Sequence, residues 1–217
     1  MEERQVVEEK MTPKQVDVCI IDDDASVLDS LDALLQSHDI EVVALPSAEA
    51  LLSRLDQGKL PSCIVSDIRL DGMSGLDLQQ ELIRRRVRVP LILITGHGEV
   101  SMAVAAIKSG AEDFIEKPFD GAALVDSIRR ALDKASREAE AERTREEIAE
   151  RLGQLSQRQR EVMDLVVLGY SSKEIAARLG ISPRTVETYR LWIMEKTGAR
   201  NLAELVRMVV QVEPVQT

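Results

Sequence analysis

Cysteine is scarce in this sequence, and long apolar runs are absent from it. Cys19 and Cys63 each lie inside a short apolar run, with no metal-like spacing and no second pair. We therefore expect two small buried thiols in a reducing compartment. No stretch approaches the ~18 apolar residues of a membrane span, and the charged first residues lack the apolar core of a signal peptide. A cytoplasmic protein without a membrane partner is expected.

An overall excess of positive charge is also lacking. The 217 residues include 28 Lys and Arg against 38 Asp and Glu, a formal net charge of -10, which by itself argues against a nucleic-acid partner. The average conceals a division, because residues 150–217 hold ten basic and eight acidic residues. Charge therefore favours the C-terminal third as the DNA-facing part.

Strand-like apolar runs alternate with helical periodicity between residues 16 and 134. The runs VDVCII, IEVVAL, SCIVSD, PLILIT and EDFIE are each followed by a segment with apolar residues at helical spacing. Five strands and five helices in alternation predict a doubly wound α/β domain with a five-stranded parallel sheet. Ligands of such sheets bind at the carboxyl ends of the strands.

A long helical linker is predicted after this domain. Ala, Glu and Arg dominate residues 133–154, with no Gly or Pro before Gly153, so a helix should continue the last helix of the α/β domain. Its apolar 3–4 stripe is interrupted by Glu142 and Glu146. A coiled-coil dimer and a solvated linker both fit this pattern.

Four short helices are predicted over residues 155–211. In the third, Ser182 is expected to cap the helix, Pro183 fits its first turn and Gly198 ends it. The predicted boundaries are a tail over residues 1–15, the α/β domain over 16–134, the linker over 135–153 and an all-α domain over 154–213.

Carboxylates gather at the ends of two strands. Asp22, Asp23 and Asp24 follow the first strand, although adjacent carboxylates repel and are costly to bury. Asp67 ends the third. If these strands are neighbours, Asp22, Asp23 and Asp67 converge and offer the hard oxygen ligands that suit hydrated Mg²⁺. That cation would relieve the repulsion and make an aspartyl phosphate chemically accessible.

Two further strand ends supply a hydroxyl and an ammonium. The fourth strand ends at Thr95 and the fifth runs into Lys117. One hydrogen-bond donor and one charged donor are what bound phosphate oxygens require. Each residue alone has an ordinary structural explanation, but their joint placement around a carboxylate favours a phosphoryl site.

Residues 16–134 resemble bacterial two-component response regulators through the ordered motifs IIDDD, VSDIRLDGMSG, ITGHG and EKPF. The resemblance implies a flavodoxin-like receiver fold in which Asp67 accepts phosphate from the histidine of a sensor kinase. It implies that Asp22, Asp23 and Asp67 hold Mg²⁺ with help from the backbone carbonyl of Arg69. Asp24 is interpreted as a helix cap.

The same resemblance assigns the rest of the pocket. Thr95 and Lys117 would bind the phosphoryl oxygens, and Phe114 resembles the aromatic switch that turns inward as Thr95 moves. One departure is present: Leu70 and Asp71 stand where the family usually has Met-Pro. The acceptor loop is therefore expected to be less rigid.

The segment SSKEIAARLG-IS-PRTVETYRLWIMEKTG fits a helix-turn-helix, whose second helix enters the major groove. Val186, Tyr189 and Ile193 share one face of that helix and should pack inward. Candidate base contacts are Arg184, Glu187, Thr188 and Leu191, and candidate phosphate contacts are Ser172, Lys173, Thr185, Arg190 and Lys196. From the pattern alone, a helical packing module that binds no DNA is the alternative.

Residues 152–211 resemble the LuxR-type DNA-binding domain, closest to its FixJ branch. Together the two resemblances imply a non-enzymatic transcriptional regulator of the LuxR/FixJ class. Its partners would be a sensor histidine kinase, double-stranded DNA and, once phosphorylated, a second copy of the chain, with RNA polymerase as a further candidate. Paired recognition helices would reach half-sites about one DNA turn apart.

Three other functions are alternatives to this one. A dehalogenase-type phosphatase requires Asp-x-Asp at the nucleophile, whereas Asp67 is followed two residues later by Arg69. A phosphorylation-independent DNA-binding regulator would keep the helix-turn-helix and lose the switch. A phospho-relay protein would use its helical domain to bind another protein.

Overall fold

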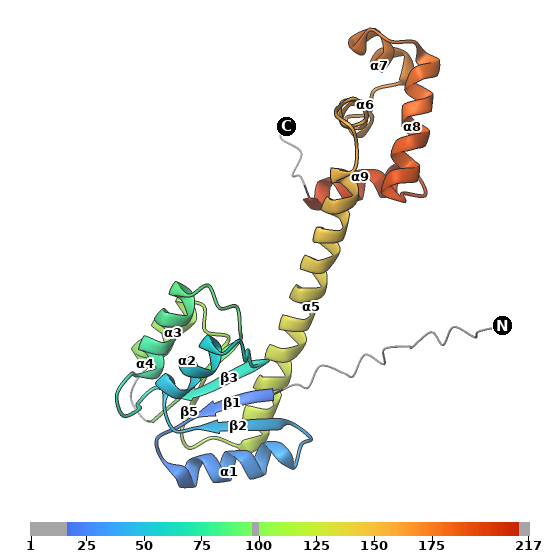
Figure 1. The fold of residues 1–217 in the computed structure, drawn as a ribbon. Helices are drawn as coiled ribbons and strands as arrows, with labels where there is room; N and C mark the ends of the chain where they lie inside the picture. The colour runs from blue at the N-terminus through green and yellow to red at the C-terminus, as the bar shows by residue number, and fades with distance from the viewer. Residues whose placement is uncertain (1–16, 97–99, 213–217) are drawn as a thin grey trace, which may run out of the picture. The chain divides into compact units, whose positions relative to one another are not determined.

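The computed structural model describes residues 17–96 and 100–212, which form two compact units (Figure 1). The first unit extends to Ser136 and the second begins at Arg137. The predicted tail over residues 1–15 lies outside the described residues. Among the helices that are described, none has the length and apolar character needed to cross a membrane.

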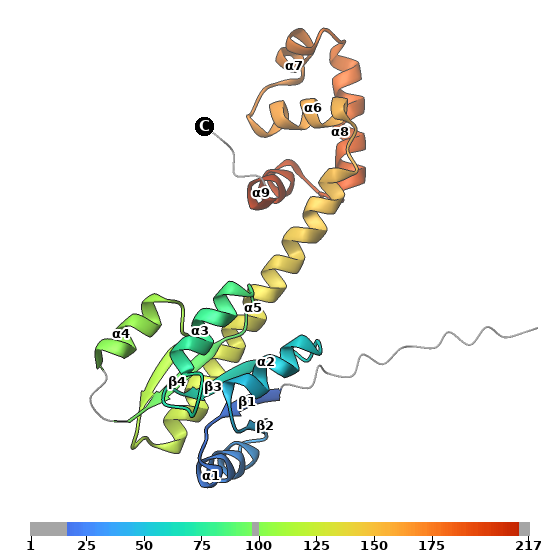
Figure 2. The same ribbon diagram turned by 60° about the vertical axis from the view of Figure 1, so that its left-hand side comes forward.

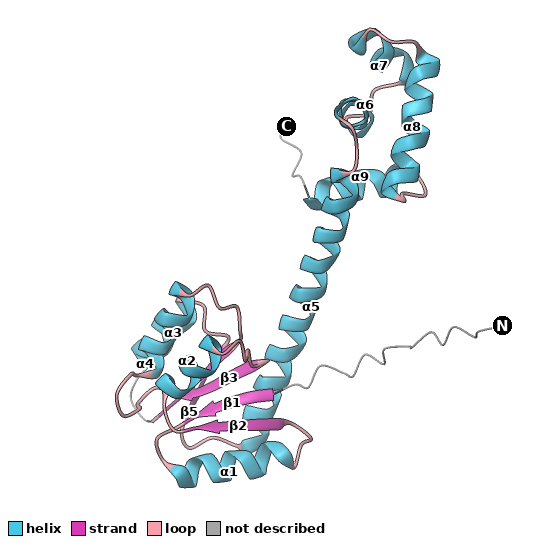
Figure 3. Cartoon of the chain, in the orientation of Figure 1, coloured by secondary structure: helices cyan, strands magenta, loops and turns pink. Residues whose placement is uncertain are grey.

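The first unit alternates strand and helix as predicted (Figure 3). Its strands are β1 (Asp17–Ile21), β2 (Glu41–Leu45), β3 (Cys63–Asp67), β4 (Leu91–Thr95) and β5 (Asp113–Glu116). Its helices are α1 (Ala25–Gln36), α2 (Ala48–Asp56), α3 (Gly75–Arg84), α4 (Val100–Lys108) and the start of α5 (Gly121–Gly153).

All neighbouring strands of the sheet are parallel, in the order β2-β1-β3-β4-β5. This arrangement confirms the predicted doubly wound α/β fold. It also makes β1 and β3 neighbours, which was the condition for the carboxylates at their ends to converge.

Both faces of the sheet are buried. Side chains alternate along each strand, so Cys19 and Ile21 pack with α2, α3 and α4, while Val18 and Ile20 pack with α1 and α5 (Figure 2). Burial on both faces explains why the inner strands are continuously apolar rather than alternating in polarity.

The two cysteines are free and buried, as predicted. Burial raises the pKa of the Cys19 thiol to about 11 and that of the Cys63 thiol to about 12. Both groups are therefore protonated at neutral pH and act as small apolar side chains.

The second unit is helical, with α6 (Gln157–Val167), α7 (Ser172–Leu179), α8 (Pro183–Thr197) and α9 (Leu202–Val212). The predicted cap of α8 is confirmed, since Ser182 Oγ accepts from the Thr185 N–H at 3.0 Å and Gly198 adopts a left-handed conformation after the helix. Pro183 is the first residue of α8.

The linker helix is continuous with the last helix of the α/β domain, as predicted, because α5 runs for 33 residues. Its final turns belong to the core of the second unit. Ile148 and Leu152 are buried there with Val162, Val186 and Ile193. This part of the predicted linker is thus neither a solvated spacer nor a free coiled-coil surface, because its apolar residues face the helices that follow it.

Candidate functional site

The carboxyl ends of β1, β3 and β5 bring Asp22, Asp67 and Lys117 together. Lys117 Nζ lies 3.1 Å from Asp22 Oδ2 and also forms an ion pair with Asp67 Oδ2. The two carboxylates are largely shielded from water, with 6% of the Asp22 side chain and 11% of the Asp67 side chain exposed. One ammonium therefore bridges two carboxylates that would otherwise repel.

Lys117 keeps its charge in this setting. Burial alone would lower its pKa, but hydrogen bonds and charge attraction from Asp67 and Asp22 outweigh burial, so the pKa of Lys117 lies above its ordinary value. At neutral pH the side chain is an ammonium. It can donate charge-assisted hydrogen bonds to an anionic oxygen.

Backbone donors hold the other oxygen of each carboxylate. The Asp24 N–H donates to Asp22 Oδ1 at 2.9 Å, and the Arg69 N–H donates to Asp67 Oδ1 at 2.7 Å. Asp24 is the N-cap of α1, where its side chain accepts from the Ser26 N–H at 2.8 Å. The prediction of Asp24 as a helix cap is confirmed.

The donor set is compatible with Mg²⁺. Across residues 17–96 and 100–212 there is no preformed group of three or more His, Cys, Asp or Glu side chains around a common point. Mg²⁺ does not require one, since it is held by one or two carboxylates and keeps several water ligands. Asp22 and Asp67 supply two hard oxygen donors, and Asp23 is exposed next to Asp22 in the chain.

Thr95 lies at the same edge of the sheet, where β4 ends. It is buried, and its carbonyl accepts from the Lys117 N–H at 2.6 Å, which joins the ends of β4 and β5. Phe114, in β5, is half-buried and packs against the core beneath α2, α3 and α4. The roles predicted for Thr95 and Phe114 stay predictions.

Two contacts around the β3–α3 connection and the start of α3 were not predicted from the sequence. Glu49 of α2 accepts a hydrogen bond from the Met73 N–H, and a Cβ added at Gly75 would lie 2.4 Å from the Asp67 carbonyl oxygen. Glu49 and Met73 are 24 positions apart in the chain. No local pattern could have indicated this hydrogen bond, whereas Gly75 and Asp67 both lie within the motif VSDIRLDGMSG.

The helix-turn-helix has the predicted inner face. Val186 and Ile193 of α8 are buried, and the half-buried Tyr189 packs against the same core. Trp192 is 46% exposed and meets Tyr189 edge to face, with ring centroids 5.6 Å apart. Leu191 is 71% exposed, which leaves its methyl groups accessible to a DNA groove.

The polar candidates for DNA contact differ in accessibility. Arg184, Glu187 and Lys173 are exposed, whereas Ser172, Thr185, Thr188 and Arg190 are half-buried. Ser172 Oγ also donates a hydrogen bond to Glu187. These two residues form a polar pair between α7 and α8, so a DNA contact to one would affect the other.

Lys196 is held within its own domain. Its ammonium donates to the Gln154 carbonyl at 3.1 Å and to Gln159 Oε1 at 3.0 Å. The side chain thus connects the end of α8 to the turn between α5 and α6. Among the predicted phosphate contacts, Lys196 is the one that the geometry supports least.

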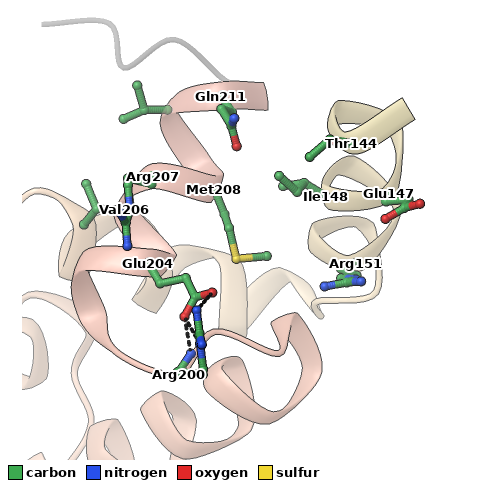
Figure 4. A pocket seen from close by; sticks show the side chains of 11 residues that line it. Thr144, Glu147, Ile148, Arg151, Arg200, Glu204, Val206, Arg207, Met208 and Gln211 are labelled. Atoms are coloured by element: carbon green, nitrogen blue, oxygen red, sulfur yellow. Dashed lines mark hydrogen bonds and ion pairs between the residues drawn. The ribbon is translucent and has the colours of Figure 1, made fainter. Parts of the chain in front are cut away.

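A groove of about 660 Å³ lies in the second unit between the end of α5 and α9 (Figure 4). Ile148 and Met208 contribute apolar side chains to it, and Arg200 pairs with Glu204 at 3.0 Å along its lining. None of the predicted DNA-contact residues lines this groove.

Comparison with known proteins assigns both units. Residues 18–129 match the family model of the response regulator receiver domain, and residues 153–209 match that of the bacterial regulatory proteins of the luxR family. The transcriptional regulatory protein FixJ of Azorhizobium caulinodans is 45% identical over 201 residues, which cover 91% of this chain and 93% of that protein.

Solved structures give the same assignment. The response regulator StyR aligns with a TM-score of 0.78 at 36% identity, covering 89% of this chain and 97% of StyR. Full-length FixJ from B. japonicum aligns with a TM-score of 0.59 at 40% identity, covering 92% of this chain and 98% of that one. The chain therefore belongs to the two-component response regulators that combine a receiver domain with a LuxR-type DNA-binding domain, the class of FixJ.

Proposed function

We propose that this protein is a transcriptional regulator whose DNA binding is controlled by phosphorylation of Asp67. The observation that carries the proposal is the Lys117 ammonium shared between Asp22 and Asp67. A phosphoryl group on Asp67 would place new anionic oxygens within reach of that ammonium. Phosphorylation must therefore rearrange a contact that joins three strand ends.

The chemistry is a transfer of one phosphoryl group. An oxygen of the Asp67 carboxylate attacks phosphorus, the bond from phosphorus to the histidine nitrogen of a sensor kinase breaks, and an aspartyl phosphate forms. Lys117 and the Thr95 hydroxyl would hold the phosphoryl oxygens. Mg²⁺, held by Asp22, Asp23, Asp67 and the Arg69 carbonyl, would neutralise charge on the transferred group.

Dimerisation would connect this chemistry to DNA. We infer that movement of Thr95 lets Phe114 turn inward and favours pairing of two chains through a surface that includes α4 and α5. A single helix-turn-helix with a slight positive charge makes few contacts, whereas two tethered copies gain affinity through effective concentration, by about 10² or more.

Two kinds of DNA contact are proposed for the paired recognition helices. Contacts to base edges would read the sequence, and contacts to phosphates would fix the register. The proposed base contacts are Arg184, Glu187, Thr188 and Leu191, and the proposed phosphate contacts are Ser172, Lys173, Thr185 and Arg190, with Lys196 retained as the weakest candidate.

The proposal is tested by measuring affinity for a selected operator fragment by fluorescence anisotropy. A small-molecule phosphodonor with Mg²⁺ should raise the affinity of the wild type by about tenfold or more, and should leave Asp67→Asn unchanged. Equal enhancement of both proteins would refute control through Asp67. Tight binding to the operator fragment with the same affinity in the presence and absence of the phosphodonor would indicate a phosphorylation-independent regulator. Absence of DNA binding would indicate a relay protein.

A further inference from the structure

The loop that follows Asp67 contains Arg69, whose backbone N–H and carbonyl both matter for the proposed phosphoryl transfer. The Arg69 N–H binds Asp67 Oδ1 at 2.7 Å, and the Arg69 carbonyl is a proposed Mg²⁺ ligand. The N–H and the carbonyl belong to the peptide groups on either side of the Arg69 Cα, so the position of the Arg69 backbone would set both the acceptor and the cation. Leu70 and Asp71 provide no proline to stiffen the loop, so its shape depends on contacts made by other elements.

Helix α2 provides such a contact through Glu49. Its Oε1 accepts a hydrogen bond from the Met73 N–H at 3.0 Å. A Cβ added at Gly72 would lie 3.0 Å from the same oxygen, and Gly72 has a φ of +91°. The loop thus turns tightly over the Glu49 carboxylate, at a position whose backbone conformation favours glycine.

Glu49 is itself on a firmly held element. It lies in the first turn of α2, which buries Ala48, Leu51 and Leu52 against the sheet. Hydrogen bonds from its own N–H, from the Met73 N–H and from the Ser47 hydroxyl hold the pKa of Glu49 below its ordinary value. Near neutral pH the group is a carboxylate that accepts hydrogen bonds.

We propose that Glu49 is a positioning residue for phosphorylation: it fixes the acceptor loop through Met73 and thereby holds the Arg69 backbone against Asp67. This inference rests on the proposed function. Glu49 would influence phosphorylation of Asp67 indirectly, through the position of the acceptor loop. Loss of the hydrogen bond should loosen the Arg69 backbone, weaken Mg²⁺ binding and slow phosphoryl uptake by about five- to tenfold.

The test compares Glu49→Ala with Glu49→Gln in the full-length chain. One measurement is the rate of phosphoryl uptake from a small-molecule phosphodonor with Mg²⁺, followed by intact mass. The other is the NMR shift of the Arg69 amide as Mg²⁺ alone is added. We expect Glu49→Ala to lower the rate and the Mg²⁺ affinity, and Glu49→Gln to restore both, because the amide oxygen can still accept from Met73.

Glu41→Ala is the matched control, since Glu41 is an exposed glutamate at the start of β2. It should match the wild type in both measurements. The inference fails if Glu49→Ala leaves the rate and the Arg69 titration unchanged, even when its melting temperature falls. It also fails if Glu49→Gln is as impaired as Glu49→Ala, because charge would then be the cause. No Mg²⁺ response and no phosphoryl uptake in the wild type would instead remove the proposed function, and the inference with it.

Discussion

Replacing Gly75 with alanine is expected to lower the free energy of unfolding by about 2–3 kcal/mol and to slow phosphorylation of Asp67 by about tenfold or more. The added Cβ would lie 2.4 Å from the Asp67 carbonyl oxygen and 3.1 Å from the Ile68 Cα. Both atoms that the added Cβ would clash with belong to the backbone, so a change of side-chain rotamer cannot relieve the clash. The residue that must move is the phosphoacceptor itself.

Gly121→Ala is the matched control for this change. Gly121 is also the first residue of a helix in the same unit, but its added Cβ would meet the Leu34 side chain, with Cδ1 at 2.9 Å. A leucine can adjust its rotamer, so we expect a loss below about 1 kcal/mol and a normal rate of phosphorylation. Denaturant unfolding and intact mass measure the two effects. Equal behaviour of the two variants would contradict the close approach at Gly75.

Lys117→Met is expected to slow phosphoryl uptake by about 10²-fold, because it removes a charged donor that would hold the phosphoryl oxygens. It should also lower the free energy of unfolding. The change leaves Asp22 and Asp67 buried without their shared ammonium, but Lys117 is 30% exposed, so screening limits the loss to about 1–2 kcal/mol. Mg²⁺ should then raise the melting temperature of this variant more than that of the wild type.

Lys134→Met controls for the loss of a lysine and of an ion pair. Lys134 Nζ lies 2.7 Å from Glu112 Oε2, and 56% of the Lys134 side chain is exposed. Such a surface pair contributes less than about 1 kcal/mol, and phosphorylation should be unaffected. The assays are the phosphorylation rate and thermal unfolding with and without Mg²⁺. A Lys117→Met variant that took up phosphate at the wild-type rate would exclude a role for Lys117 in binding the phosphoryl oxygens.

Much of the fold could be predicted because its signals are local. The continuous apolar strands indicate a sheet that is covered on both faces, and the three residues Ser182, Pro183 and Gly198 mark the ends of α8 through their own backbone preferences. The end of the linker was harder to predict. Ile148 and Leu152 are buried by helices that come later in the chain, which composition alone does not reveal.

The site was predictable where the chemistry lies at strand ends. Once β1 and β3 are neighbours, Asp22 and Asp67 must converge, and Lys117 follows from the end of β5. The contacts that support the site could not be predicted in this way. Glu49 and Lys196 bind groups from distant parts of the chain, and nothing in their local sequence distinguishes them from surface charges that make no such contact.

The central claim is that Asp67 carries a phosphoryl group, and intact mass spectrometry tests it most directly. The wild type, Asp67→Asn and a Mg²⁺-free wild-type sample are incubated with a small-molecule phosphodonor or with a purified sensor kinase. We predict a gain of about 80 Da, one phosphoryl group, in the wild type with Mg²⁺ and in neither of the other samples. The same gain in Asp67→Asn, or no gain in the wild type with either donor, would contradict the proposed acceptor.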